Sequence, residues 1–480
     1  MTTARKTILG TYWTVVLNFY TQLATLVVYA LLARILTVDE FGLIALCFLI
    51  TEMMVLFSNF GVNQILIQRR NWSPTLATNC YWFLISLSTF FSALIIFLIA
   101  PISDRYFYPN SADLLYWLAS IPIINSFSLV SLARLQRNFQ NKTIMIVNVI
   151  GNTLGGIISI VLVLYDFGVW SVVTGKIIQT ICVTTFFIFL DRFTPSHSIS
   201  LKYMRFIAGF GLPLFFNAGL NFVSQRSINF TTAFILGSSS FALISVSQRA
   251  FRMISEVTVT PLNAVLLPGF SRAKARLDLT DVYVQVIKLA ACIIMPLYLG
   301  LAIVSEELIF LIFGVQWERS AHLLTLLCFT MIPNLIVWFL PSLLISRART
   351  KPVFKANAIA TLLKLFLAGI GAFHSIEWSI LGLFIANCLM VYIKFKITNQ
   401  HIEVRLFNSL KAVFPPTFCS VFMFVFSTYI FATISTDLVL IVALFGKIII
   451  GFLIYTLLMF TFFNSYARDV ISDLFEKIKS

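Results

Sequence analysis

Charged residues are scarce in this sequence. Only 11% of its 480 residues are Asp, Glu, Lys or Arg, whereas 59% are hydrophobic. A soluble domain carries roughly 25% charged residues, so this composition excludes a protein whose whole surface faces water. Apolar runs of about twenty residues recur along the chain instead, and each is long enough to cross a hydrocarbon core.

Residues that form disulfides or bind metals are also few and scattered. The seven cysteines stand singly without a C-x-x-C pair, and the four histidines are dispersed. This pattern argues against a disulfide framework and a zinc site, and we expect no metal and no cofactor. The segment from Gly168 to Lys176 has the wrong spacing for a P-loop and carries Ile177 where Ser or Thr belongs, so no ATPase is predicted.

The apolar runs predict an all-α integral membrane protein with about fourteen transmembrane helices. A twelve-span interpretation is retained in case the last pair does not cross. The first run follows two cations without a cleavage site, which indicates a membrane span rather than a removed signal peptide. The predicted spans are 8–32, 43–67, 80–101, 113–133, 144–165, 171–190, 207–231, 241–266, 283–304, 321–345, 354–373, 378–398, 412–433 and 438–463.

The distribution of basic residues predicts the orientation of the spans. The net charge is +15, but the cations form no single stripe, so nucleic acid is not an expected partner. With the N-terminus inside, 24 of the 34 Lys and Arg lie on the inner side, three lie outside and seven fall within spans. By the positive-inside rule both ends are cytoplasmic. Ten acidic residues fall outside, namely Asp39, Glu40, Asp104, Asp113, Asp166, Glu306, Glu307, Glu318, Glu377 and Asp437.

A weak internal repeat relates the two halves of the chain. The segment 33–44 resembles 233–244, with Ala, Ile, Leu, Phe, Leu and Ile at matching positions. An offset of six spans keeps both copies in one orientation, which is typical of lobes related by a pseudo-two-fold axis along the membrane normal. We therefore predict an N-terminal lobe at 1–200, a C-terminal lobe at 201–400, and two appended helices with a cytoplasmic tail at 401–480.

Several charges fall inside the predicted spans, where a charged side chain costs several kcal/mol and normally faces a bundle interior or a wet cavity. Arg249, Arg252 and Glu256 recur at i, i+3 and i+7 and therefore share one helical face. The spans of the two lobes hold more cations than acids, and this surplus predicts an anionic cargo. The candidate cargo-binding residues are Arg226, Arg249, Arg252, Lys288 and Lys364, and the candidates for ion coupling and charge pairing are Glu52 and Glu256.

Structural roles remain open for several of these residues. Lys176, Lys288 and Lys447 either line a cavity or extend to the interface, and Lys394 is interpreted as extending to the interface. Arg252 and Glu256 could form a structural i,i+4 pair. The repeat makes Glu52 equivalent to Arg252, and their pairing across the axis is either a switch or a permanent lock.

Short motifs along the chain resemble those of the Wzx-type polysaccharide exporters of the multidrug/oligosaccharidyl-lipid/polysaccharide superfamily, in the branch typified by the colanic acid exporter. The resemblance extends from the first span to the loop after the tenth, and hydropathy continues it to the end. No single motif is specific, but their order and spacing agree with the family. The motifs are Ala33-Arg-Ile-Leu with Phe41-Gly-Leu, Phe60-Gly-Val-Asn with Ile67-Gln-Arg, Leu135-Gln-Arg-Asn-Phe, Val265-Leu-Leu-Pro-Gly-Phe, Phe313-Gly-Val-Gln-Trp and Ser346-Arg-Ala-Arg.

This resemblance implies a flippase of the bacterial inner membrane rather than an enzyme. Its expected cargo is an undecaprenyl-pyrophosphate-linked repeat unit for capsule, exopolysaccharide or O-antigen, moved by alternating access through a cationic cavity between two lobes. Expected partners are the lipid-linked anionic oligosaccharide, membrane lipid and a coupling ion, H⁺ or Na⁺. A polysaccharide polymerase and assembly proteins are further candidate partners.

Two other functions remain alternatives. A multidrug or cation antiporter of the same superfamily favours an acidic, aromatic-lined cavity, whereas these spans hold seven cations and two acids. A membrane-embedded glycosyltransferase, polymerase or ligase needs a sizeable polar loop with catalytic groups. The largest inner loop, 191–205, offers only Asp191 and His197.

Overall fold

The computed structural model describes residues 3–68, 72–106, 108–197, 199–272, 279–347, 349–434 and 440–469. Over these residues the chain is all α, as predicted, and forms no strand. Helices suit a lipid environment because each one satisfies its own backbone N–H and C=O groups, for which lipid offers no partners. Arg69, Ala348 and Asp437, which the sequence analysis places in loops, lie outside the described residues.

The helices divide into two compact units. The first unit comprises Met1–Gln225 with Gly237–Ala242, and the second comprises Arg226–Leu236 with Leu243–Ser480. Helix α13 therefore begins in the first unit and continues in the second. The predicted lobe boundaries at residues 200 and 400 remain a prediction.

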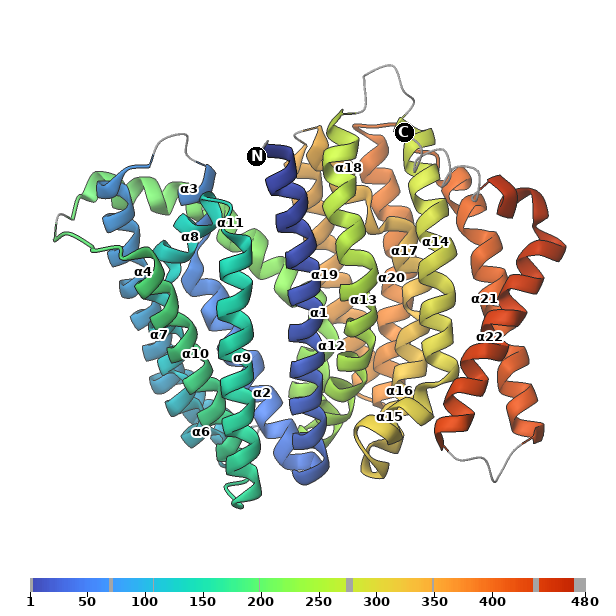
Figure 1. Ribbon diagram of the computed structural model, residues 1–480, viewed down its shortest axis with the longest axis horizontal. Coiled ribbons are helices and arrows are strands. Elements are labelled where there is room, and N and C mark those ends of the chain that lie inside the picture. Colours follow the sequence, from blue (N-terminus) through green and yellow to red (C-terminus); the bar gives the residue numbers. More distant parts are fainter. Residues whose placement is uncertain are drawn as a thin grey trace. The chain divides into compact units, whose positions relative to one another are not determined.

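The first unit is built from long helices separated by short or broken ones (Figure 1). They are α1 (Thr3–Ile35), α2 (Val38–Asn59), α3 (Val62–Gln68), α4 (Pro74–Leu94), the π-helix η1 (Ile95–Ile99), α5 (Ala100–Tyr106), α6 (Ser111–Leu118), α7 (Ser120–Ser126), α8 (Leu129–Arg137), α9 (Asn141–Leu164), α10 (Val169–Asp191) and α11 (Leu201–Gln225).

The second unit also combines long helices with short ones, and its last two helices pack against each other. Its helices are α12 (Ser227–Thr231), the π-helix η2 (Thr232–Leu236), α13 (Ser238–Arg272), α14 (Leu279–Ile303), α15 (Ser305–Ile312), the 3₁₀-helix η3 (Val315–Trp317), α16 (Glu318–Phe329), α17 (Met331–Trp338), α18 (Leu340–Ser346), α19 (Thr350–Ala372), α20 (Ile376–Asn399), α21 (Leu406–Ile434) and α22 (Leu440–Phe462).

Helical structure occurs over every predicted span, within the described residues. Among the residues that the structure describes, eleven helices are long and apolar enough to cross a membrane, or up to twelve if the pair bent by 43° at α7–α8 is one span. Helices α1 and α13 were predicted as spans too and contain 33 and 35 residues, more than the roughly 20 that a crossing requires. The number fourteen and the cytoplasmic location of both ends remain predictions.

Many of the acidic residues predicted to lie outside occupy the first turn of a helix. Thr37 and Glu40 form a capping box at the start of α2, in which Thr37 N donates to Glu40 Oε2 over 2.9 Å. The N-terminus of a helix carries a partial positive charge that acids neutralise. Capping of helix N-termini therefore accounts for the position of these acids. The other predicted outer acids in first turns are Asp39, Asp113, Glu306, Glu307, Glu318 and Glu377, and Asp281 of the predicted inner side lies in the first turn of α14.

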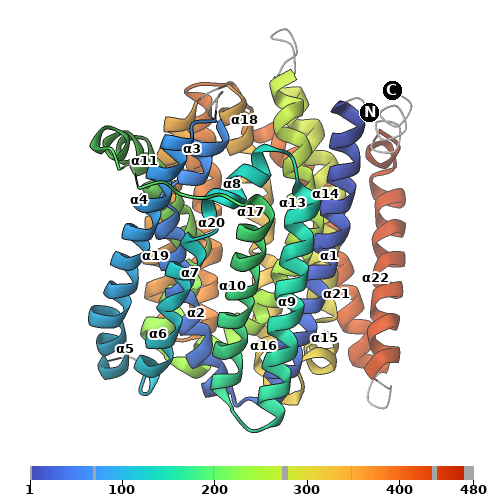
Figure 2. The same cartoon turned by 60° about the vertical axis from the view of Figure 1, so that its left-hand side comes forward.

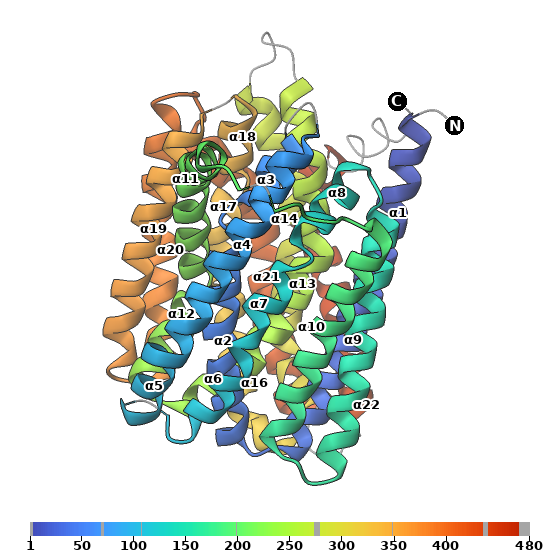
Figure 3. The same ribbon diagram turned by 90° about the vertical axis from the view of Figure 1, so that its left-hand side faces the viewer.

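Glycines allow α9 and α10 to approach closely in the first unit, where they run side by side (Figure 2). A Cβ atom built on Gly155 would lie 2.7 Å from the carbonyl oxygen of Gly175, and one on Gly151 would lie 2.3 Å from Val183 Cγ2. The Gly151-x-x-x-Gly155 motif is therefore a packing notch within the fold. On another side of α9, Gly156 contacts Val28 of α1, which lies along α9 (Figure 3).

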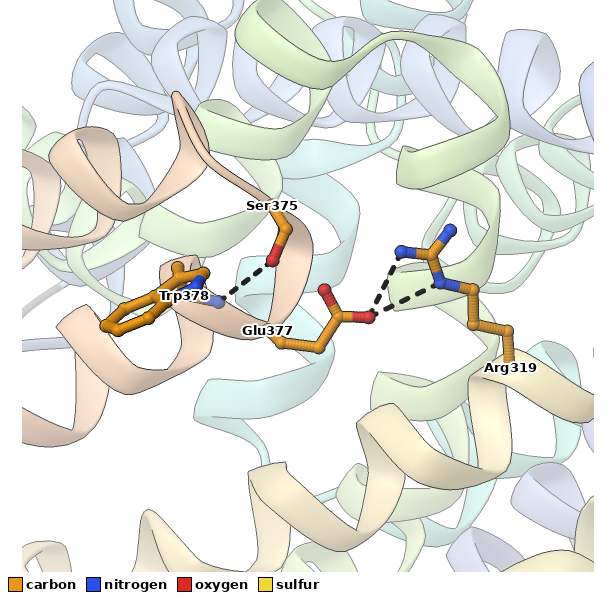
Figure 4. Close-up of polar contacts among 4 residues, drawn as sticks. All are labelled: Arg319, Ser375, Glu377 and Trp378. Atoms are coloured by element: carbon orange, nitrogen blue, oxygen red, sulfur yellow. Dashed lines mark hydrogen bonds and ion pairs between the residues drawn. The ribbon is translucent and has the colours of Figure 1, made fainter.

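Polar contacts fasten helices of the second unit at the end predicted to be outside. Arg319 at the start of α16 donates through Nε and an Nη atom to Glu377 Oε1 on α20, over 3.3 and 3.1 Å (Figure 4). Ser375 caps α20 by accepting a hydrogen bond from the backbone N–H of Trp378. The arginine side chain is 58% exposed, so this pair contributes at most about 1 kcal/mol.

Candidate transport site

A basic face runs along α13. Arg249, Arg252 and Glu256 are all partly buried on this helix. The carboxylate of Glu256 interacts electrostatically with both guanidinium groups, and its Oε2 atom is buried yet accepts no hydrogen bond from the described residues. The structure therefore brings the three predicted residues together, as a charged group with two cations and one acid.

Another side of α13 packs against α14. The ring of Phe251 contacts that of Tyr298 with centroids 4.8 Å apart and planes inclined by 55°, and Ser255 hydrogen-bonds the hydroxyl of Tyr298. Tyr298 is fully buried. Because residues advance about 100° around a helix, Phe251 lies roughly opposite Arg249 and Glu256, whereas Ser255 lies only about 60° from Arg252. Arg249 and Glu256 therefore point away from Tyr298, and Arg252 lies at the edge of the contact with α14.

A second cationic group lies between α19 and α20. Lys364 and Lys394 are partly buried and interact electrostatically with each other. Their helices are antiparallel neighbours, and side chains lean toward the N-terminus of their own helix, so the two ammonium groups converge from different depths. Among the described residues, neither lysine takes part in an ion pair. Two like charges held close repel each other, and an anion bound between them would relieve this repulsion.

Two other lysines within predicted spans have acidic partners. Lys447 of α22 lies 2.5 Å from Glu307 of α15, with side chains 14% and 9% exposed. Lys288 of α14 lies 3.6 Å from Asp469 and above the ring of Tyr466, 4.5 Å from its centroid. Both pairs fasten α22 and the segment after it to the helices α14 and α15. Both lysines therefore have an acidic partner within the fold, and the cargo-binding role of Lys288 remains a prediction.

The first unit contains its own polar group. Glu52 of α2 is exposed and interacts electrostatically with Lys176 of α10. Lys176 Nζ donates to Gln179 Oε1 over 3.2 Å, and the amide of Gln179 donates to Asn152 Oδ1 of α9. Lys176 is thus part of a network across three helices.

Arg226 lies at the break between α11 and α12, where it is the N-cap residue of α12 and is partly buried. The predicted span 207–231 is therefore interrupted at this arginine. The described residues place Arg226 on a different element from both cationic groups of the second unit. A common cavity for Arg226 and the other candidates remains a prediction.

The electrostatic interaction between Lys394 and Lys364 was not predicted from the sequence. Lys394 lies five residues before the end of α20, a position at which a lysine commonly extends to the interface. This interaction could have been predicted from two features. The two helices are antiparallel and joined by a short loop, and their side chains lean toward the N-terminus of each helix.

The fold is that of a multi-pass membrane transporter. A solved structure of the lipid II flippase MurJ in an inward closed conformation superimposes with a TM-score of 0.77, covering 97% of this chain and 100% of that chain at 15% identity. At this identity the likeness shows the fold alone. The chain is a multi-pass protein of the bacterial inner membrane.

The chain belongs to the family described as "Polysaccharide biosynthesis protein", whose model matches residues 31–322. The succinoglycan biosynthesis transport protein ExoT of Rhizobium meliloti (strain 1021) is 21% identical over 333 residues, 67% of each chain. The lipopolysaccharide biosynthesis protein WzxC of Escherichia coli (strain K12) is 23% identical over 367 residues, 76% of this chain and 74% of WzxC. These findings confirm the resemblance seen in the motifs.

Proposed function

We propose that this chain is a flippase that moves an undecaprenyl-pyrophosphate-linked oligosaccharide from the cytoplasmic to the periplasmic leaflet. The repeat unit then enters capsule, exopolysaccharide or O-antigen. The observation that carries the proposal is the pair Lys364 and Lys394, whose neighbouring charges are not neutralised by acids in the described part of the chain. Arg249 and Arg252 on α13 supply two further cations for binding an anion.

The cargo explains why cations are useful inside apolar helices. A pyrophosphate stripped of water in hydrocarbon costs far more than thermal energy. Arginine replaces water well because its planar guanidinium group donates two parallel hydrogen bonds to phosphate oxygens, and lysine adds a compact charge. The isoprenoid tail needs no such site, because it stays in lipid.

The names of two relatives support this class of cargo. ExoT is named for transport in succinoglycan biosynthesis and WzxC for lipopolysaccharide biosynthesis. The identity of the glycan carried by this chain is not part of the proposal, because the cationic groups recognise the pyrophosphate that all such carriers share.

The proposed mechanism is alternating access, driven by H⁺ or Na⁺. Glu256 is the candidate coupling group of the second unit because its carboxylate interacts with both Arg249 and Arg252. Protonation of Glu256 would strengthen the field that the two arginines present to an anion. Glu52 is the candidate of the first unit, where it interacts with Lys176. In transporters built from repeats, one repeat rocks against the other and opens the site to each side of the membrane in turn. We expect the two units to move in this way.

A cation antiporter is the leading rival, and the charges oppose it. Cationic drugs require an acidic site, whereas Lys364 and Lys394 present two positive charges to each other. An enzyme acting on the same lipid carrier is the second rival. ExoT is named as a transport protein, which favours a transporter over an enzyme.

Export by a strain that lacks the gene tests the proposal. The deletion strain should accumulate lipid-linked repeat units on the cytoplasmic face, and the wild-type gene should restore polymer. Arg252→Ala should reduce export about tenfold or more, since a charged hydrogen bond is worth about 1.5–3 kcal/mol, while the protein remains inserted. Arg319→Ala removes an arginine from an exposed pair and is the matched control. Normal export by the Arg252 variant would contradict the proposal.

A further inference from the structure

A separate cationic cavity lies where α19 begins and α20 ends. It has a volume of about 500 Å³ and is lined by Arg349, Lys351 and Lys355 at the start of α19 and by His401 after α20. None of the residues that line it is acidic. The cavity gathers three permanent cations from one short segment, and an imidazole from another segment faces them.

The backbone adds to the positive potential of this cavity. Helix α19 has 23 residues, its first turn contains no acid, and no side chain caps it. The N–H groups of its first turn therefore carry a partial positive charge that no side-chain cap or acid of that turn offsets. Pro352 and Ile397 are buried and form the apolar part of the lining. Such a combination suits a phosphate group attached to an apolar body.

The exposed face of α19 indicates that the bound phosphate belongs to a lipid. Lys351 and Lys355 are followed at spacings of seven and four residues by Leu362 and Phe366, so all four share one face of the helix. Leu362 and Phe366 are 69% and 66% exposed. A cationic cavity at one end of an exposed apolar stripe matches the headgroup and acyl chains of a phospholipid.

We propose that the cavity formed by Arg349, Lys351, Lys355 and His401 binds the phosphate of an anionic membrane lipid at the cytoplasmic end of α19 and α20. The positive-inside rule explains cations in this loop but not their convergence on a cavity. This site is distinct from Lys364 and Lys394, and the proposal does not depend on the transported cargo. Its ligand is a resident lipid that holds the α19–α20 hairpin at the membrane surface.

The test uses the purified full-length protein in detergent and measures the dissociation constant for phosphatidylglycerol by native mass spectrometry. The double variant Lys351→Gln/Lys355→Gln should weaken binding about 30-fold, because each lysine near an anionic lipid contributes about 1 kcal/mol. The control Lys202→Gln/Lys411→Gln removes two exposed lysines from the same predicted side, outside the cavity. This control should bind as the wild type does.

Two further binding measurements distinguish an anionic lipid from other ligands. Phosphatidylcholine, with the same acyl chains, and inorganic phosphate should both bind much more weakly than phosphatidylglycerol. Equal loss of binding in the cavity variant and the control would overturn the site, because it would show a diffuse surface effect. Equal affinity for inorganic phosphate would overturn the lipid assignment. A circular dichroism spectrum like that of the wild type confirms that the cavity variant is folded.

Discussion

Two sets of lysines in the second unit occupy apolar helices but have opposite surroundings. Lys447 and Lys288 each contact a carboxylate and join α22 and the segment after it to the rest of the unit. Lys364 of α19 and Lys394 of α20 instead interact electrostatically with each other. A charge within a membrane span therefore indicates a binding site only when the protein supplies no countercharge. We therefore expect the first set to stabilise the fold and the second set to bind an anionic ligand.

The largest effect that we expect comes from breaking the buried pair. Lys447→Met leaves Glu307 buried without its partner, which costs about 3–5 kcal/mol. Thermal unfolding of the purified protein should show this loss. Adding Glu307→Leu should restore most of the stability, since an apolar pair replaces a buried ion pair at little cost. If Lys447→Met were as stable as the wild type, the ion pair between Lys447 and Glu307 would not stabilise the fold.

The second set should show the reverse pattern. Lys364→Gln/Lys394→Gln removes two repelling charges, so thermal stability should be unchanged or raised. Polymer export should fall at least tenfold, because the site loses two cations that each contribute about 1 kcal/mol or more to binding an anion. Export measured per inserted protein checks this split. Loss of stability equal to that of Lys447→Met would erase the distinction between the two sets.

The smallest effect is expected at Lys288. Its partner Asp469 is 70% exposed, so solvent screens the pair and its contribution is about 1 kcal/mol or less. Lys288→Gln should lower the melting temperature slightly and leave export near the wild-type level. A tenfold loss of export at normal stability would return Lys288 to the cargo site, where the sequence analysis placed it.

The sequence predicted the helices better than the partners of their charges. Apolar runs located helical structure over all fourteen predicted segments, because the length of a span follows directly from the thickness of hydrocarbon. The Gly151-x-x-x-Gly155 spacing likewise places both glycines on one face of α9. Both features depend on local pattern alone.

The ion pairs were hidden because they join distant segments. Glu307 was counted among outer residues, since it follows the end of an apolar run, yet in the folded chain it is 9% exposed and contacts a lysine 140 positions later. Asp469 was counted as part of an inner tail. Neither contact follows from hydropathy or periodicity, which describe one helix at a time. The convergence of Lys364 and Lys394 required the helix order and the side-chain direction together.

Direct binding of the lipid carrier tests the central claim. Undecaprenyl pyrophosphate should bind the purified wild-type protein and the control Lys202→Gln/Lys411→Gln with the same dissociation constant. Lys364→Gln/Lys394→Gln should bind it at least tenfold more weakly, since about 1.4 kcal/mol corresponds to a factor of ten. Equal affinity of all three proteins would show that the neighbouring lysines of α19 and α20 do not hold the pyrophosphate, and the account would fail.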